Sequence, residues 1–113
     1  MADDRRRAGE TAEIRRLRRR IDALDRKLVA LLNERAGLAR EAGRAKTAAG
    51  RTAIRDADRE REVLLRVSIA NEGPMPQADL LAMYRRLFAA TRALEARDRE
   101  RDRARRERGD EPT

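Results

Sequence analysis

The sequence predicts an all-α protein: a three-helix chain with one very long N-terminal helix, in an intertwined helical-bundle homodimer. Charged residues make up 44% of the 113-residue chain and aromatic residues 2%, so a wide globular core cannot form. The apolar residues are mainly leucine, alanine, isoleucine and valine at helical spacing, and a helical bundle is the simplest fold that buries them. A chain of this length holds one domain at most.

The first predicted helix covers residues 14–46, which contain no proline. Thr11 is a suitable N-cap and Gly50 a suitable C-terminal stop. At about 1.5 Å per residue the helix is about 50 Å long, too long for one small domain to cover, so we expect a partner helix from a second copy. Its apolar stripe, with the three- and four-residue spacing of a helix face, is Ile14, Leu17, Ile21, Leu24, Leu28, Leu31, Leu38, Ala42 and Ala45.

Two shorter helices follow. Asp56 is a plausible N-cap for a helix that ends near Ala70, and the third helix begins near Gln77 or Asp79. Prolines in the segment NEGPMPQ favour a turn between the two helices. The face that we expect to be buried is Ala57, Glu60, Leu64 and Val67 in the second helix, and Leu80, Leu81, Tyr84, Leu87, Phe88, Thr91, Leu94 and Glu95 in the third.

Outside the helices the sequence predicts a disordered N-terminal tail at 1–12 and a charged, solvated C-terminal tail at 97–113, on either side of a folded domain at 13–96. No run of about 18 apolar residues is present, so we expect no membrane span. The N-terminus lacks the apolar region of a signal peptide. These features predict a cytoplasmic protein.

The composition also limits the chemistry. The chain has no cysteine and no histidine, which excludes disulfides, thiolate nucleophiles, histidine acid–base catalysis and most zinc sites. We expect neither a metal nor a cofactor. The net charge of +8 lies in residues 14–95, with 19 basic and 11 acidic groups, and would suit DNA, RNA or a small anion. No DNA-binding motif or base-stacking aromatic pattern is present, so we expect no nucleic-acid partner.

Polar residues interrupt the apolar faces at a few positions. Arg35 stands between Leu31 and Leu38 in the stripe, where a guanidinium is costly unless an anion meets it. A carboxylate from another helix could be that anion, in a purely structural ion pair. Lys46 lies eleven residues after Arg35, close to three full turns, so the two side chains point the same way. Two cations on one inner face suit a small bound polyanion.

The other helices add carboxylates and a hydroxyl. Glu60 lies in the second buried face, and Thr91 and Glu95 lie one turn apart in the third. These groups suit hydroxyl or ether contacts to a ligand. Arg18 lies seventeen residues before Arg35, which turns it by roughly 100° on the same helix. It could therefore join this site only from a second subunit.

Together these features resemble the all-helical class of chorismate mutases. The matching segments are RRRIDALDRKLVALLNERAGLAREAGRAK, IRDADREREVL and MYRRLFAATRALE, which lie within residues 14–96. Each alone is an ordinary amphipathic helix, but all three in this order, with polar residues at these positions, are specific. The resemblance implies an isomerase of the shikimate pathway to the aromatic amino acids, which converts the dianion chorismate to prephenate as a homodimer with shared active sites.

The resemblance implies a role for each matching residue. Arg18 reaches a substrate carboxylate across the dimer, and Arg35 grips a carboxylate within its own subunit. Lys46 contacts a carboxylate and the ether oxygen, and Glu95 faces the same ether oxygen. Thr91 lies near a carboxylate. Three of these are the expected catalytic residues: Arg35, Lys46 and Glu95.

The same comparison places Asp56, Arg59 and Glu60 in the wall of the pocket, with Glu60 on the ring hydroxyl. The linker KTAAGRTAIRD departs from the family because it lacks the proline often found there. Isochorismate-pyruvate lyase and 4-amino-4-deoxychorismate mutase are alternatives on the same fold; the DADRE segment and Lys46 favour chorismate. A non-enzymatic basic helical dimer is a more remote alternative, since it would not need Arg35 or Glu60 in the apolar faces.

Overall fold

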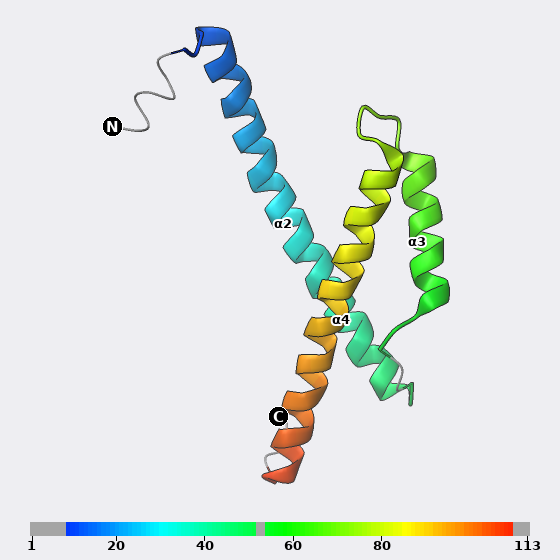
Figure 1. Ribbon diagram of the computed structural model, residues 1–113. Coiled ribbons are helices and arrows are strands. Elements are labelled where there is room, and N and C mark those ends of the chain that lie inside the picture. Colours follow the sequence, from blue (N-terminus) through cyan, green and yellow to red (C-terminus); the bar gives the residue numbers. More distant parts are fainter. Residues whose placement is uncertain (1–8, 52–53, 110–113) are drawn as a thin grey trace. The chain divides into compact units, whose positions relative to one another are not determined.

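The structure is a computed structural model that describes residues 9–51 and 54–109 (Figure 1). These residues form three α-helices and no strand: α2 (Ala12–Ala48), α3 (Ala57–Ala70) and α4 (Gln77–Glu107). The all-α class with one long N-terminal helix is confirmed. Most of the predicted N-terminal tail, residues 1–8, lies outside the described residues, as do residues 110–113 of the C-terminal tail.

The helices begin where the sequence predicts. The Thr11 hydroxyl accepts a hydrogen bond from the Ile14 amide at 3.2 Å and caps α2. The Asp56 carboxylate accepts one from the Arg59 amide at 3.0 Å and caps α3. Such caps satisfy amide groups that the first helical turn leaves without a partner. α4 begins directly after Pro76, at Gln77.

The end of α2 is also confirmed. Gly50 has a φ of 81°, in the left-handed region that glycine adopts at little cost. This lets the Arg51 amide donate to the Lys46 carbonyl at 2.9 Å and the Gly50 amide to the Thr47 carbonyl at 3.0 Å. The last carbonyls of α2 are thereby satisfied and the chain leaves the helix axis.

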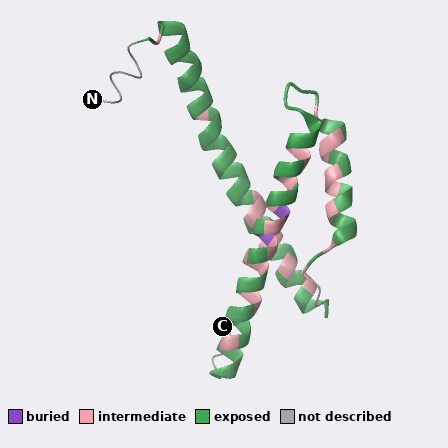
Figure 2. Cartoon of the chain, in the orientation of Figure 1, coloured by how far each residue is buried: buried purple, intermediate pink, exposed green. Residues whose placement is uncertain are grey.

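The chain divides into two compact units, one ending at Gly37 and one beginning at Leu38. The first unit contains the N-terminal part of α2. Its apolar stripe is exposed to solvent, with Leu24 58% and Leu31 60% accessible. In Figure 2 most residues of this segment are coloured as exposed. The stripe has the spacing that the sequence predicts, and among the described residues of this unit no second helix covers it.

The second unit contains residues 38–48 of α2 and the hairpin of α3 and α4. The two helices of the hairpin lie side by side and pack against each other (Figure 1). In their turn, the Asn71 side chain accepts from the Gly73 amide at 3.1 Å and donates to the Met75 carbonyl at 3.1 Å. These bonds hold the turn that the sequence predicts around its prolines.

The buried residues of the described chain lie on α4 (Figure 2). They are Phe88 and Thr91, and the ring of Tyr84 packs edge-on against Phe88 with centroids 6.2 Å apart. Leu64 and Val67 of α3 are half-buried as predicted, whereas Ala57, predicted for the same face, is exposed. Ala57 begins the first turn of α3, directly after its cap.

α4 continues without a break beyond residue 96 to Glu107. Within the described residues, no helix is long and apolar enough to cross a membrane. The extended part of α4 is not wholly solvated, because the Asp98 side chain is only 12% exposed. Its partner lies on α2, a contact that the charge pattern of this segment did not predict.

Candidate active site

The beginning of α3 is tied to the end of α2 through Asp56. One carboxylate oxygen accepts the capping bond from Arg59, and the other lies 3.8 Å from the Lys46 ammonium and 3.6 Å from the Arg51 guanidinium. The Arg59 hydrogen bond, together with Lys46 and Arg51, holds the pKa of Asp56 below its usual range although partial burial opposes this. Two sequence-predicted site residues, Lys46 and Asp56, are thus brought together.

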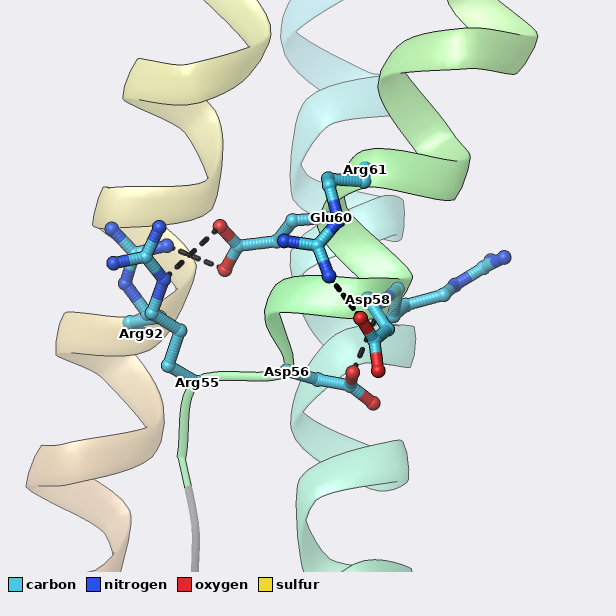
Figure 3. A network of polar contacts seen from close by, with 7 residues as sticks. Arg55, Asp56, Asp58, Glu60, Arg61 and Arg92 are labelled. Atoms are coloured by element: carbon cyan, nitrogen blue, oxygen red, sulfur yellow. Dashed lines mark hydrogen bonds and ion pairs between the residues drawn. The ribbon is translucent and has the colours of Figure 1, made fainter.

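Glu60 lies one turn further along α3 and bridges to α4. Its carboxylate accepts a hydrogen bond from the Arg92 guanidinium at 2.5 Å, and the Arg55 guanidinium lies 3.6 Å from its other oxygen. Figure 3 shows Glu60 reaching from α3 toward these two arginines. The Glu60 side chain is 17% exposed, so two cations compensate a largely buried carboxylate.

Arg92 is the residue that the sequence analysis missed at this site. The signal was present in the helical spacing: Phe88, Arg92 and Glu95 follow one another at intervals of four and three residues and share one face of α4. Because Phe88 is buried, its neighbour one turn later lies on the buried side of α4 as well. The pairing with Glu60 in particular depends on the register of two helices, which a single sequence does not display.

Thr91 is buried, and its hydroxyl donates to the Leu87 carbonyl of its own helix at 2.9 Å. Its oxygen retains acceptor capacity, and the hydroxyl can rotate toward another acceptor. Arg59, by contrast, is turned along its own helix, where its guanidinium lies 3.3 Å from Glu62 and is about half exposed. Within this chain the structure therefore groups Thr91 with the buried face but not Arg59.

Glu95 lies on α4, four residues after Thr91, and is partly buried. Burial raises the pKa of its carboxyl group above the usual range, while the positive charge of Lys46, and more weakly of Arg99 and Arg92, opposes that rise. Its side chain packs closely over Gly43 of α2. A hollow between α2 and α4 is lined by Glu95, Gly43, Thr47 and Arg99, among others. Lys46 of α2 and Glu95 of α4 therefore interact electrostatically.

Arg18 and Arg35 belong to the first unit. The Arg18 guanidinium forms an ion pair with Glu10, at the start of the same segment. Arg35 lies in the last turns of this unit, in the position between Leu31 and Leu38 that the sequence predicts. Both residues lie on the part of α2 that precedes the second unit, so they are not among the residues that this unit brings together.

The second unit therefore gathers Lys46, Arg55 and Arg92 around Asp56, Glu60 and Glu95. Such a site can hold carboxylates and hydrogen-bond to hydroxyl or ether oxygens, and it contains no cysteine or histidine nucleophile. Among the described residues, no group of three or more carboxylates forms a metal-binding cluster. Charge placement, rather than a covalent intermediate, is the chemistry that these side chains offer.

Comparison with known proteins agrees with this chemistry. Residues 17–96 match the family model described as chorismate mutase type II. The chorismate mutase (Form II) of Thermus thermophilus is similar in structure, with a TM-score of 0.71 and 34% identity over 75% of this chain and 96% of that one. Form I of the same protein gives a TM-score of 0.66 at 33% identity, over 70% of this chain and 98% of that one.

Curated relatives are longer proteins. A bifunctional chorismate mutase/prephenate dehydratase of Aquifex aeolicus is 37% identical over 87 residues, which are 74% of this chain but 24% of that protein. A protein of the same description from Escherichia coli is 55% identical over 51 residues, 45% of this chain and 13% of its own length. The chain spans about a quarter of the first of these relatives.

Proposed function

This chain belongs to the type II chorismate mutase family, and from that premise we propose that it converts chorismate to prephenate. The observation that carries the proposal is the family match over residues 17–96, since every proposed site residue, from Arg18 to Glu95, lies inside it. We take residues 13–96 as the catalytic domain, with tails at 1–12 and 97–113. A cytoplasmic location is part of the same proposal.

The reaction is a rearrangement within one molecule. The substrate must be held by its two carboxylates so that its side chain lies over the ring, which is a task of positioning. Arginine forks suit carboxylates, so Arg18 and Arg35 are the proposed grips. We propose that Thr91 lies near a carboxylate and that Asp56, Arg59 and Glu60 line the pocket, with Glu60 on the ring hydroxyl. Arg59 would have to leave its contact with Glu62 to do so.

Negative charge grows on the ether oxygen as the carbon–oxygen bond breaks. A cation and a hydrogen-bond donor fixed there stabilise the transition state more than the bound substrate. Lys46 is the proposed cation and Glu95, in its protonated form, the proposed donor. The influence of Lys46 on the pKa of Glu95 supports the view that the two groups serve one oxygen. Neither a metal nor a cofactor is required by this chemistry.

We propose that the active form is a homodimer with two composite sites. The exposed apolar stripe of the first unit supports a second copy as its cover. Arg18 of one subunit would then contact a carboxylate of the substrate that the other subunit binds. It would be a third cation at the substrate, besides Arg35 and Lys46. In the single chain Arg18 pairs with Glu10, a contact that the substrate would replace.

The direct test is the loss of chorismate absorbance on addition of the purified protein. We expect turnover that survives a metal chelator, and a loss of about 10²-fold or more in kcat/KM for Arg35→Ala, as for removal of one charge-stabilising donor. Arg61→Ala is the matched control, because Arg61 is 71% exposed and pairs with Asp58, three residues earlier on the same helix. Activity close to wild type in Arg35→Ala would remove Arg35 from the site.

Isochorismate and 4-amino-4-deoxychorismate belong in the same assay. Faster turnover of either would assign the chain to a lyase or mutase of that substrate on the same fold. Absence of turnover of all three by a folded dimer would favour the non-enzymatic basic helical dimer.

A further inference from the structure

We propose that Gly43 and the ion pair between Arg40 and Asp98 position Glu95 for its role at the ether oxygen. This inference rests on the proposed function and names residues that act through Glu95. Asp98 lies beyond residue 96, where the family match ends. The positioning device would therefore draw on the extended part of α4, the segment that the sequence predicted to be a solvated tail.

Gly43 leaves room for Glu95 at a point where a Cβ atom would make an unusually tight contact with the Glu95 side chain. A Cβ atom added to Gly43 would lie 3.3 Å from both Cγ and Cδ of Glu95 and 3.5 Å from its Oε1. The backbone does not demand glycine there, because Gly43 is inside α2 and has no positive φ. Alanine is the better helix former. The space above Gly43 is therefore used by the Glu95 side chain.

The Arg40–Asp98 pair fixes the same crossing one turn away. Arg40 donates two parallel hydrogen bonds to the Asp98 carboxylate, at 2.9 and 2.8 Å, and the Arg44 guanidinium lies 3.9 Å from it. The hydrogen bonds between them lower the pKa of Asp98 and raise that of Arg40. A bidentate pair is specific in geometry as well as in charge.

The contact of Glu95 with Gly43 and the ion pair of Asp98 with Arg40 together fix the register of α4 against α2. Glu95 meets Gly43, and Asp98, three residues later, meets Arg40, three residues earlier. Both contacts join α2 to α4, so a slip of either helix along its axis would break both. Glu95 is held between them, where burial raises the pKa of its carboxyl group. The charged groups that act on it are Lys46 of α2 and Arg92, Asp98 and Arg99 of α4.

The principal test is Gly43→Ala in the full-length protein, with Gly37→Ala as the matched control. Gly37 lies on the same helix, and a Cβ there meets nothing within 4 Å. The pKa of the Glu95 carboxyl group is measured by carbon NMR, which needs folded protein but no enzymatic activity. We expect Gly43→Ala to push the carboxyl toward solvent, so that its pKa falls toward the usual range, and Gly37→Ala to leave it unchanged.

Kinetics provide the second readout. We expect Gly43→Ala to lower kcat/KM for chorismate by about 10-fold or more, since small misplacements of a catalytic group are costly. In a Glu95→Ala background, which lacks the Cγ and Cδ atoms that a Cβ at position 43 would press against, the same change should cost nothing further. Asp98→Asn should give a smaller loss in the same direction, with Glu100→Gln, an exposed position, as its control.

An unchanged Glu95 pKa in Gly43→Ala, or a kinetic loss that persists in the Glu95→Ala background, would overturn the proposal. If Gly43→Ala does not fold by circular dichroism, Asp98→Asn decides it: a Glu95 pKa equal to that of wild type would count against the positioning role. A wild-type protein that does not act on chorismate would refute the proposed function, while the NMR titration would still decide whether Gly43 and Asp98 position Glu95.

Discussion

The two units of the chain differ in how far their apolar side chains are buried. In the second unit, Phe88 is 6% exposed, and α3 and α4 cover each other. In the first unit, Leu28 and Leu31 are 54% and 60% exposed, although they stand in a regular stripe. Covering such half-exposed leucines contributes roughly 1 kcal/mol each. The two helices of the hairpin cover each other, whereas the stripe stays exposed in the single chain, which is the basis of the proposed dimer.

The largest expected effect comes from placing a charge in the stripe. Leu28→Asp would bury a carboxylate between the paired helices of the proposed dimer, so we expect loss of the dimer and of all measurable activity. Leu65→Asp is the control: Leu65 is 62% exposed on α3 and lies outside the predicted buried face. Sedimentation with activity assays separates the two. A dimer that survives Leu28→Asp would show that the stripe is not its interface.

Complementation is the next sharpest test of the difference between the units. Arg18→Ala and Arg35→Ala should each be inactive alone, because each lesion reaches both sites of a homodimer. A mixed dimer has one site with both lesions and one with neither, if Arg18 serves the partner's site. Mixing the two proteins should therefore restore part of the activity. No recovery, with subunit exchange shown by labelled chains, would mean that Arg18 and Arg35 serve the same subunit.

The sequence predicted the helices well because their ends depend on local chemistry. Thr11 and Asp56 cap the helices that follow them, and Gly50 ends α2 in the left-handed conformation. A cap involves residues three apart in the chain, so its partners can be found from spacing alone. The apolar stripe likewise depends only on the period of one helix.

Contacts between helices were harder to predict for a physical reason. Glu60 could pair with any of many arginines, and the choice of Arg92 follows from the register of α3 against α4. The same is true of Asp98 and Arg40, which lie 58 residues apart. Of the predicted site, Lys46 and Asp56 are brought together and Glu95 lies near Lys46. The roles of all eight predicted residues stay predictions until the variants are assayed.

A moderate effect is expected from Glu95 and pH. A carboxyl group can help at the ether oxygen only when protonated, because it must donate a hydrogen bond. Burial raises its pKa, and a dianionic substrate would raise it further, while Lys46 opposes the rise. We expect kcat/KM to fall as the pH rises through this pKa. Glu95→Gln, which keeps a donor at every pH, should flatten the fall; an identical slope in both proteins would exclude Glu95 from the ether oxygen.

The smallest expected effect tests how far the second unit depends on its own ion pair. The hydrogen bonds from Arg40 keep the pKa of Asp98 lower in the folded chain than in the unfolded one. Asp98 therefore stabilises the folded state at pH values above about 3.9, the usual carboxyl value, and this contribution is lost as the pH falls through the folded-state pKa. At neutral pH, Asp98→Asn should lower the free energy of unfolding by about 1 kcal/mol, the upper range for pairs near the surface.

Thermal unfolding at a series of pH values measures this contribution. At neutral pH the unfolding midpoint of Asp98→Asn should lie about 4–8 °C below that of the wild type. This gap should shrink in acid, because protonation of Asp98 removes the same charge that the substitution removes. Glu100→Gln, whose side chain is 74% exposed and 3.7 Å from Arg103, should shift it far less at any pH. A difference that stays constant into acid would mean that the Asp98 side chain stabilises α4 by its packing and that its charge contributes nothing to the crossing with α2.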